Sequence, residues 1–219
     1  MVSRPSDHAA GSSPDPEPFP TSAAAHAPQP KVPIPVKIVV AGGFAVGKTT
    51  FVGSISEIEP LTTEAVMTRA SEGIDDLGAA SSSKTSTTVA MDFGRITLGN
   101  DDLVLYLFGT PGQERFHFMW DELVKGAIGA VVLVDTGRLA DCFPAVDYFE
   151  QRSVPFVVAV NCFHGAVLHP LESVREALAI SPDVPMFHTD ARERGATRDA
   201  LLTLVQHALV RTRARVGAG

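Results

Sequence analysis

The sequence has few cysteines, no basic run and no long apolar segment. Only Cys142 and Cys162 are present among 219 residues, and their spacing matches no metal-binding motif. The N-terminus lacks the basic start and apolar stretch of a secretory signal, so we expect a reducing, cytoplasmic compartment. The longest apolar runs, near 128–134 and 154–160, are too short to cross a membrane and are typical of buried strands.

The charge balance argues against a nucleic-acid-binding protein. The net charge is −7, and no Lys/Arg cluster is available to neutralise phosphates along a nucleic acid. The second residue is Val2 rather than the glycine that myristoylation needs, and residues 216–219 hold no cysteine for prenylation. We therefore expect no nucleic-acid partner, and membrane association only through another protein.

Proline marks the organisation of the chain. Residues 1–35 are rich in proline and poor in large apolar side chains, which predicts a disordered tail. A docking segment for a proline-reading module is the alternative reading. Residues 36–213 are expected to form one domain and 214–219 a flexible end, while the sequence leaves open whether 59–86 is ordered.

Hydrophobic periodicity predicts alternating strands and helices. The expected strands are 36–41, 87–98, 103–108, 128–134, 155–160 and 185–188. The expected helices are 48–58, 115–126, 141–152, 171–179 and 196–213. This order predicts an α/β fold with a mainly parallel six-stranded sheet, one antiparallel edge strand and helices on both faces. Ligands then belong at the carboxyl ends of the strands.

A phosphate-binding loop lies between the first strand and the first helix. Its Gly-x-x-x-x-Gly-Lys-Thr spacing lets the backbone wrap around phosphates and aims amide N–H groups and a helix N-terminus at them. We expect Lys48 to reach the β and γ phosphates and Thr49 to bind Mg²⁺. The residues predicted to contact the nucleotide here are Gly42, Phe44, Ala45, Val46, Gly47, Lys48, Thr49 and Thr50.

Two later segments carry a resemblance to a known family. Thr88–Phe93 resembles the switch I threonine and strand of Rab-type GTPases, and Gly109–Phe116 resembles their switch II. With the phosphate loop and Asn161, the resemblance covers most of 36–211 and implies the Ras-like P-loop NTPase fold. The phenylalanine in the phosphate loop, the Pro-Gly-Gln of switch II and the proline-rich leader are similar to bacterial conservon GTPases, relatives of the gliding-motility MglA-type proteins.

The resemblance implies roles for individual residues. Thr88 would coordinate Mg²⁺ in the GTP state, the Gly112 amide would sense the γ-phosphate, and Gln113 would orient the attacking water with Lys48 as the second catalytic group. Loss of the γ-phosphate would release both switch segments. The implied partners are a Roadblock/LC7-type regulator and other conservon components, such as a sensor-kinase-like membrane protein.

Gly109 departs from the family pattern. Most Ras-like proteins carry an aspartate there, which holds a Mg²⁺-bound water, and glycine has no such group. Asp92 lies four residues after Thr88, on the same face of an unbroken strand, next to the strand that ends at Gly109. Our hypothesis is that Asp92 supplies the missing carboxylate as a metal ligand; a solvent-facing strand residue is the alternative.

Phe44 is the second departure. It stands with Ala45 where Ras-like loops usually have glycine beside the γ-phosphate. A ring at this place is expected to crowd the catalytic water and Gln113. We therefore predict slow unaided hydrolysis and a partner that rearranges switch II.

The base-binding segments also differ from the family. In Asn161-Cys162-Phe163-His164, the lysine and aspartate of the Asn-Lys-x-Asp motif are replaced. Neutral His164 has one acceptor nitrogen and cannot reproduce the paired contact of an aspartate with guanine. Residues 189–192 take the place of the Ser-Ala-Lys loop, where Asp190, the Ala191 amide and the Arg192 stem are predicted to lie at the base, unless the segment is a plain connection.

These observations favour a GTP-binding, GTP-hydrolysing switch with Mg²⁺ as cofactor and GTP/GDP as ligand. A pseudo-GTPase scaffold is the alternative. Gly109, Phe44 and His164 favour it, whereas the intact Lys48, Thr49 and Gln113 oppose it. A P-loop ATPase or kinase is a third reading, for which no second substrate site is visible in the sequence.

Overall fold

The computed structural model describes most of the chain after residue 31. The described ranges are 32–68, 86–98, 103–112, 114–162 and 168–217. The tail predicted over 1–35 lies outside these residues up to position 31, as do Gln113 and His164.

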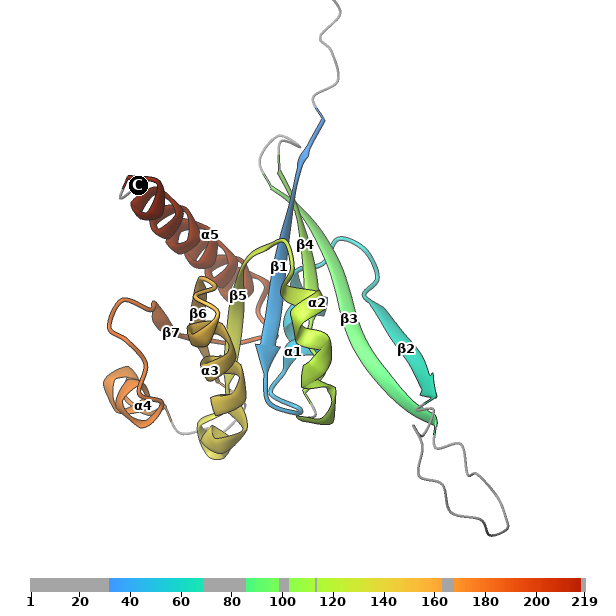
Figure 1. Ribbon diagram of the computed structural model, residues 1–219, viewed down its shortest axis with the longest axis horizontal. Helices are drawn as coiled ribbons and strands as arrows, with labels where there is room; N and C mark the ends of the chain where they lie inside the picture. Colours follow the sequence, from blue (N-terminus) through green and yellow to red (C-terminus); the bar gives the residue numbers. More distant parts are fainter. Residues whose placement is uncertain (1–31, 69–85, 99–102, 113, 163–167, 218–219) are drawn as a thin grey trace, which may run out of the picture. The chain divides into compact units, whose positions relative to one another are not determined.

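The described strands form one sheet in the order β2-β3-β4-β1-β5-β6-β7 (Figure 1). Among these strands, β3 alone runs opposite to all the others, so its pairings with β2 and with β4 are both antiparallel. This confirms the mainly parallel sheet with one antiparallel strand. The strands are β1 Ile34–Gly42, β2 Leu61–Thr68, β3 Ser86–Leu98, β4 Leu103–Gly109, β5 Ala127–Val134, β6 Phe156–Asn161 and β7 Met186–Thr189.

The predicted helices form, two of them after a 3₁₀ turn. The helix expected over 141–152 begins regular winding only at Phe143, with Pro144 in its first turn, where a missing N–H has no cost. Within the described part of the chain, no helix is both long and apolar enough to cross a membrane. The helices are α1 Lys48–Ile55, η1 Glu114–Met119, α2 Trp120–Val124, η2 Thr136–Cys142, α3 Phe143–Gln151, α4 Leu171–Ala177 and α5 Arg194–Gly217.

Two apolar cores cover the two faces of the sheet. The side chains of β1 alternate between them: Ile38 and Val40 join the core under α1 and α5, and Val39 and Ala41 join the core under α2, α3 and α4. In Figure 1, α2 and α3 lie in front of the sheet and α1 behind it. The central strands are therefore apolar on both sides, which is why their sequences read as unbroken hydrophobic runs.

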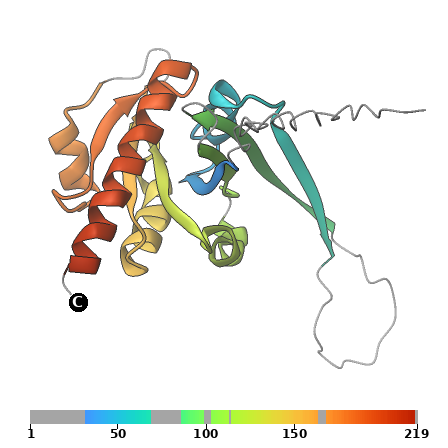
Figure 2. The same ribbon diagram turned by 90° about the horizontal axis from the view of Figure 1, so that it is seen from above.

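The strand count predicted from the sequence is too low by one. β2 lies in the segment 59–86, whose order the sequence leaves open, and it pairs with β3 from Leu61 opposite Phe93 to Thr68 opposite Ser86. Figures 1 and 2 both show β2 and β3 side by side. The antiparallel strand β3 is thus not the edge, because β2 covers it and satisfies its second row of backbone groups.

Contacts with the end of α1 hold β3 in place. The Glu57 backbone N–H donates to the Arg95 carbonyl at 2.8 Å, and the Thr97 hydroxyl donates to the Glu57 carboxylate at 2.9 Å. A Cβ atom at Gly94 would lie 2.6 Å from a methyl carbon of Val52, so only glycine allows this close approach. These contacts fix the register of β3 beside the phosphate loop.

Candidate functional site

The phosphate loop is a tight turn shaped by neighbouring strands. It leaves β1 at Gly42 and enters α1 at Lys48. Gly42 and Gly47 have positive φ angles of 137° and 106°. A Cβ atom at Gly42 would lie 2.5 Å from the Leu133 carbonyl oxygen, and one at Gly47 would lie 2.7 Å from Asn161 Nδ2. Both motif glycines are therefore required by conformation and by space.

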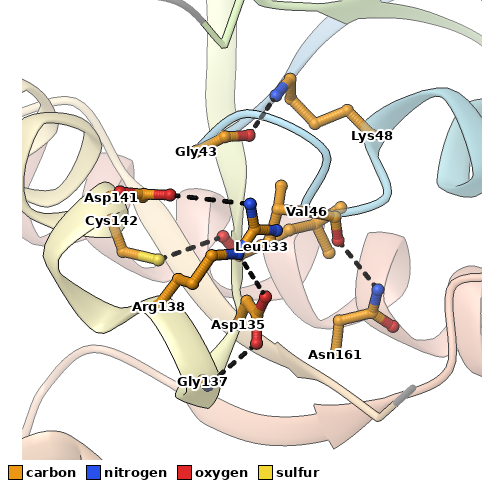
Figure 3. A network of polar contacts seen from close by, with 10 residues as sticks. All are labelled: Gly43, Val46, Lys48, Leu133, Asp135, Gly137, Arg138, Asp141, Cys142 and Asn161. Carbon is orange, nitrogen blue, oxygen red and sulfur yellow. Dashed lines mark hydrogen bonds and ion pairs between the residues drawn. The ribbon is translucent and has the colours of Figure 1, made fainter. Parts of the chain in front are cut away.

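Lys48 is bound within the loop that it follows. Its Nζ donates to the Gly43 carbonyl at 2.6 Å (Figure 3) and to the Gly42 carbonyl at 3.0 Å. Burial lowers the pKa of Lys48 to about 8, and the negative charge of Asp92 opposes this shift. A buried ammonium held by two carbonyls can exchange them for phosphate oxygens, which are stronger, charged acceptors.

Asp92 lies beside α1, where the sequence hypothesis needs a carboxylate. Its side chain is buried, and Oδ2 accepts a hydrogen bond from the Thr49 hydroxyl at 2.7 Å. A Cβ atom at Gly109 would lie 3.1 Å from both Cβ and Oδ2 of Asp92. The Asp92 carboxylate therefore fills space that a side chain at Gly109 would need, and the solvent-facing alternative is wrong.

The oxygen atoms gathered here are suitable ligands for a magnesium ion. Thr49 and Asp92 offer a hydroxyl and a carboxylate, and Thr110 Oγ1 is buried without a hydrogen-bond partner among the described residues. No cluster of three or more His, Cys, Asp and Glu side chains occurs in the described ranges. Mg²⁺ prefers oxygen and keeps several waters, so one carboxylate with hydroxyls suits it. These groups line a cavity of about 280 Å³ that also includes Phe44, Ala45, Gly47, Lys48, Thr50 and Gly112.

Thr88 is distant from this cluster in the observed arrangement. Its backbone belongs to β3 and pairs with Val66, while its side chain lies outside the described atoms. β3 is unbroken, so four residues of strand place Thr88 about 13 Å from Asp92. The two residues cannot share one ion at that separation. The ligand role of Thr88 stays a prediction for a different arrangement of β3.

The segment that resembles switch II packs at its start on the phosphate loop. A Cβ atom at Gly112 would lie 2.6 Å from Lys48 Nζ and 2.9 Å from the Gly43 carbonyl oxygen. The Pro111 carbonyl accepts a hydrogen bond from Trp120 Nε1 at 3.4 Å. This segment is therefore tied to both the loop and α2, directly before Gln113.

The aromatic residues after switch II divide between two roles. Phe116 and Trp120 are buried and belong to the core, whereas Phe118 is 57 % exposed. Phe44 is also exposed, at 59 %, and its Cα would lie 2.9 Å from a Cβ atom at Gly112. The Phe44 backbone thus lies against Gly112, and the crowding of the catalytic water and Gln113 by its ring stays a prediction.

Asn161 joins three segments at the end of β6. Its Nδ2 donates to the Val46 carbonyl at 2.9 Å (Figure 3), and its Oδ1 accepts from the Ala191 backbone N–H at 3.0 Å. The sequence predicts that the Ala191 amide contacts the base. In the structure this amide donates to the buried Asn161 side chain at the wall of a cavity, and its contact with a base stays a prediction.

A second cavity lies on the base side of the loop. It has a volume of about 110 Å³ and is lined by Gly47, Thr50, Asn161, Cys162, Asp190, Ala191 and Arg192. Asp190 forms an ion pair with Arg192, with Oδ2 at 2.5 Å from Nη2 and Oδ1 at 2.8 Å from Nε. The structure thus brings the residues predicted from 161 and from 190–192 together around one cavity.

Three site residues escaped sequence reasoning. A Cβ atom at Gly43 would lie 2.6 Å from Asp141 Cβ, so Gly43 is needed for the loop to approach η2. Thr110 and Cys162 line the phosphate-side and base-side cavities. Thr110 directly follows Gly109, and Cys162 directly follows Asn161. Residues next to a site residue at a strand end lie at the same edge of the sheet, so this adjacency could have identified both.

Comparison with known proteins identifies relatives. Residues 40–211 match the family described as "Conserved hypothetical ATP binding protein". An uncharacterized protein from Methanocaldococcus jannaschii is 30 % identical over 127 residues, 57 % of this chain and 68 % of the relative. The human Ras-related protein Rab-7b is 26 % identical over 185 residues, 80 % of this chain and 83 % of Rab-7b.

Solved structures share the fold at low sequence identity. The cytosolic domain of the T. maritima FeoB iron transporter in apo form matches with a TM-score of 0.56 and 15 % identity, over 80 % of this chain and 64 % of that one. The FeoB G-domain from Methanococcus jannaschii matches with a TM-score of 0.52 and 11 % identity, over 80 % and 97 %. This chain therefore spans about two thirds of the first structure. The likeness confirms the Ras-like P-loop architecture predicted from the sequence.

Proposed function

We propose that this chain, which belongs to the family described as conserved hypothetical ATP binding proteins, is a nucleotide-dependent switch. In this proposal it requires Mg²⁺, binds GTP and hydrolyses it slowly. It is a nucleotide-binding protein with a G-domain-like fold. The observation that carries the proposal is the Asp92 carboxylate, which fills the space beside Gly109 and accepts the Thr49 hydroxyl. A carboxylate and a hydroxyl held together beside a phosphate loop are oxygen ligands of the kind that Mg²⁺ prefers.

Each residue of the phosphate side has a distinct task in this proposal. Thr49 and Asp92 would hold Mg²⁺, which neutralises charge on the β and γ phosphates when bound. Lys48 would leave the Gly42 and Gly43 carbonyls for the phosphates. Gln113 would orient the attacking water, a role that rests on the sequence resemblance.

The base is proposed to be guanine, although the family description names ATP. The switch II sequence and the similarity to Rab-7b support GTP. The conservon-type assignment and a Roadblock/LC7-type regulator stay predictions from the resemblance. A regulator fits the exposed Phe44 ring beside Gly112, because a partner that moves switch II would also relieve crowding at the loop.

Calorimetry of the full chain with GTP, GDP and ATP, each with and without Mg²⁺, tests the proposal. We expect both guanine nucleotides to bind more tightly than ATP and to require Mg²⁺ for full affinity. A single-turnover assay should show slow release of phosphate from GTP. The absence of any nucleotide binding would leave the pseudo-GTPase scaffold as the better reading, and fast unaided hydrolysis would contradict the predicted crowding by Phe44.

Trp120 reports directly on switch movement. It is the single tryptophan of the chain, it is buried, and it donates to the Pro111 carbonyl beside Gly112. If the γ-phosphate rearranges switch II, the emission of Trp120 should differ between the GDP complex and the complex with a non-hydrolysable GTP analogue. Identical spectra for two saturated complexes would argue against a switch at this segment.

The Lys48 ammonium makes nucleotide affinity depend on pH. Its pKa is about 8 in the free protein, and contact with phosphate is expected to raise it, so the complex binds more protons than the free protein. Affinity should therefore fall as pH rises, by about fourfold between pH 7 and 8.5. Calorimetry across this range checks the slope. In a Lys48→Arg variant that still binds, the guanidinium stays charged and affinity should not follow the same curve.

A further inference from the structure

The base-side cavity contains one carboxylate among the described residues that line it, and that carboxylate is Asp190. The motif aspartate that normally reads guanine is replaced in this sequence by His164. Asp190 belongs to a different segment, directly after β7, yet it borders the same cavity as Asn161 at the end of β6. β6 and β7 pair in parallel, with Asn161 opposite Thr189, so their carboxyl ends deliver both residues to one place.

Asn161 has a connecting role in this arrangement. Both ends of its side-chain amide are engaged, one with the Val46 carbonyl and the other with the Ala191 N–H. Its role here is to connect the phosphate loop with the loop that carries Asp190. The remaining N–H of Asn161 Nδ2 can only donate, so it cannot pair with the donors on the edge of guanine. Asp190 is the charged acceptor in the described wall of the cavity.

We propose that Asp190 is the residue that selects guanine, taking over the role of the carboxylate missing at His164. This inference rests on the proposed nucleotide-binding function. An ionised carboxylate only accepts hydrogen bonds. The Watson–Crick edge of guanine offers two adjacent donors, N1–H and the 2-amino group, whereas adenine has an acceptor at N1 and no amino group at C2. Asp190 therefore favours guanine. With adenine in the cavity, the carboxylate oxygens would face no pair of hydrogen-bond donors, and this disfavours adenine.

Arg192 makes this role compatible with the observed contacts. The Asp190–Arg192 pair lies near the surface, with 40 % of the Arg192 side chain and 25 % of the Asp190 side chain exposed. Asp190 Oδ1 accepts from the backbone N–H and from Nε of Arg192, and Oδ2 accepts from Nη2. Because the side-chain pair is partly exposed, guanine donors can replace its two side-chain contacts while the backbone contact holds the carboxylate in place. Because Arg192 follows two residues later, its stem stays at the cavity and can cover the base.

An Asp190→Asn variant of the full chain tests this proposal, because the substitution is expected to change which base is preferred. Calorimetry with Mg²⁺ would compare GDP, ADP and xanthosine diphosphate, in which the 2-amino donor is replaced by an oxygen acceptor. Asparagine presents one acceptor and one donor, so it matches xanthine rather than guanine. We expect GDP affinity to fall on the order of 100-fold and xanthosine diphosphate to become the tighter ligand. Asp199→Asn, which removes an exposed carboxylate on α5, should keep the wild-type order.

The wild-type protein allows a second, independent test of the role of Asp190. Inosine diphosphate lacks the 2-amino group and should bind about tenfold more weakly than GDP if two donors are read by one carboxylate. Asp190→Glu should keep the preference for GDP over xanthosine diphosphate. Unchanged GDP preference in a folded Asp190→Asn variant, equal binding of GDP and inosine diphosphate by the wild type, or tight ADP binding would each overturn the proposal. Failure of the wild type to bind any nucleotide would instead refute the proposed function.

Discussion

Replacing Asp92 by alanine is expected to remove most of the gain in nucleotide affinity that Mg²⁺ provides. The Asp92 carboxylate is buried and accepts the Thr49 hydroxyl, so its loss takes the only carboxylate from the described wall of the phosphate cavity. A hydrogen bond or ligand contact of a charged group contributes about 1.5–3 kcal/mol, equivalent to about 10- to 150-fold in affinity. GDP affinity measured with Mg²⁺ should fall by this factor, and affinity measured in EDTA should change little.

Two further variants separate a metal role from a structural one. Asp199→Ala removes a carboxylate that is 76 % exposed on α5 and should leave the effect of Mg²⁺ unchanged. The double variant Asp92→Gly with Gly109→Asp returns a carboxylate to the same space from β4 instead of β3, because a Cβ atom at Gly109 would lie 3.1 Å from the present Asp92 carboxylate. This exchange should recover a large part of the Mg²⁺ effect. An Asp92→Ala protein with a wild-type response to Mg²⁺ would refute the assignment.

The features that the sequence predicted well are local ones. The phosphate loop needs a strand, a glycine turn and a helix within a short stretch, so the motif and its neighbours contain the whole structure. Buried strands such as β5 and β6 are equally clear, because apolar cores on both faces require an unbroken hydrophobic run. Both kinds of feature depend on residues close together in the chain.

The features that the sequence missed depend on distant partners. β2 has polar residues and becomes a strand through its pairing with β3, from Leu61 opposite Phe93 onward. The Ala191 amide is bound by Asn161, thirty positions earlier in the chain, and no local pattern encodes that hydrogen bond. Asp92 could be predicted from the sequence because Gly109 stands where related proteins have an aspartate, so another carboxylate was expected nearby. Its burial and its hydrogen bond with Thr49 are visible only in the structure.

Replacing Asn161 by alanine is expected to lower both stability and nucleotide affinity. The side chain is buried and satisfies the Val46 carbonyl and the Ala191 N–H, which lie in loops after two different strands. Alanine would leave both backbone groups without their partner, at about 1–3 kcal/mol for each. We expect a loss of about 2–4 kcal/mol in the free energy of unfolding, seen as a fall of roughly 5–15 °C in Tm.

The effect on binding follows from geometry rather than from a lost contact with the base. Without Asn161, the phosphate loop and the loop carrying Asp190 are no longer held at a fixed distance, so the two cavities lose their relative placement. Cys162→Ala is the matched control, since the next residue makes only a weak contact of 3.7 Å from Sγ to the Val160 carbonyl. It should change stability by less than about 1 kcal/mol. Equal Tm values for the Asn161 and Cys162 variants would show that Asn161 does not join these loops.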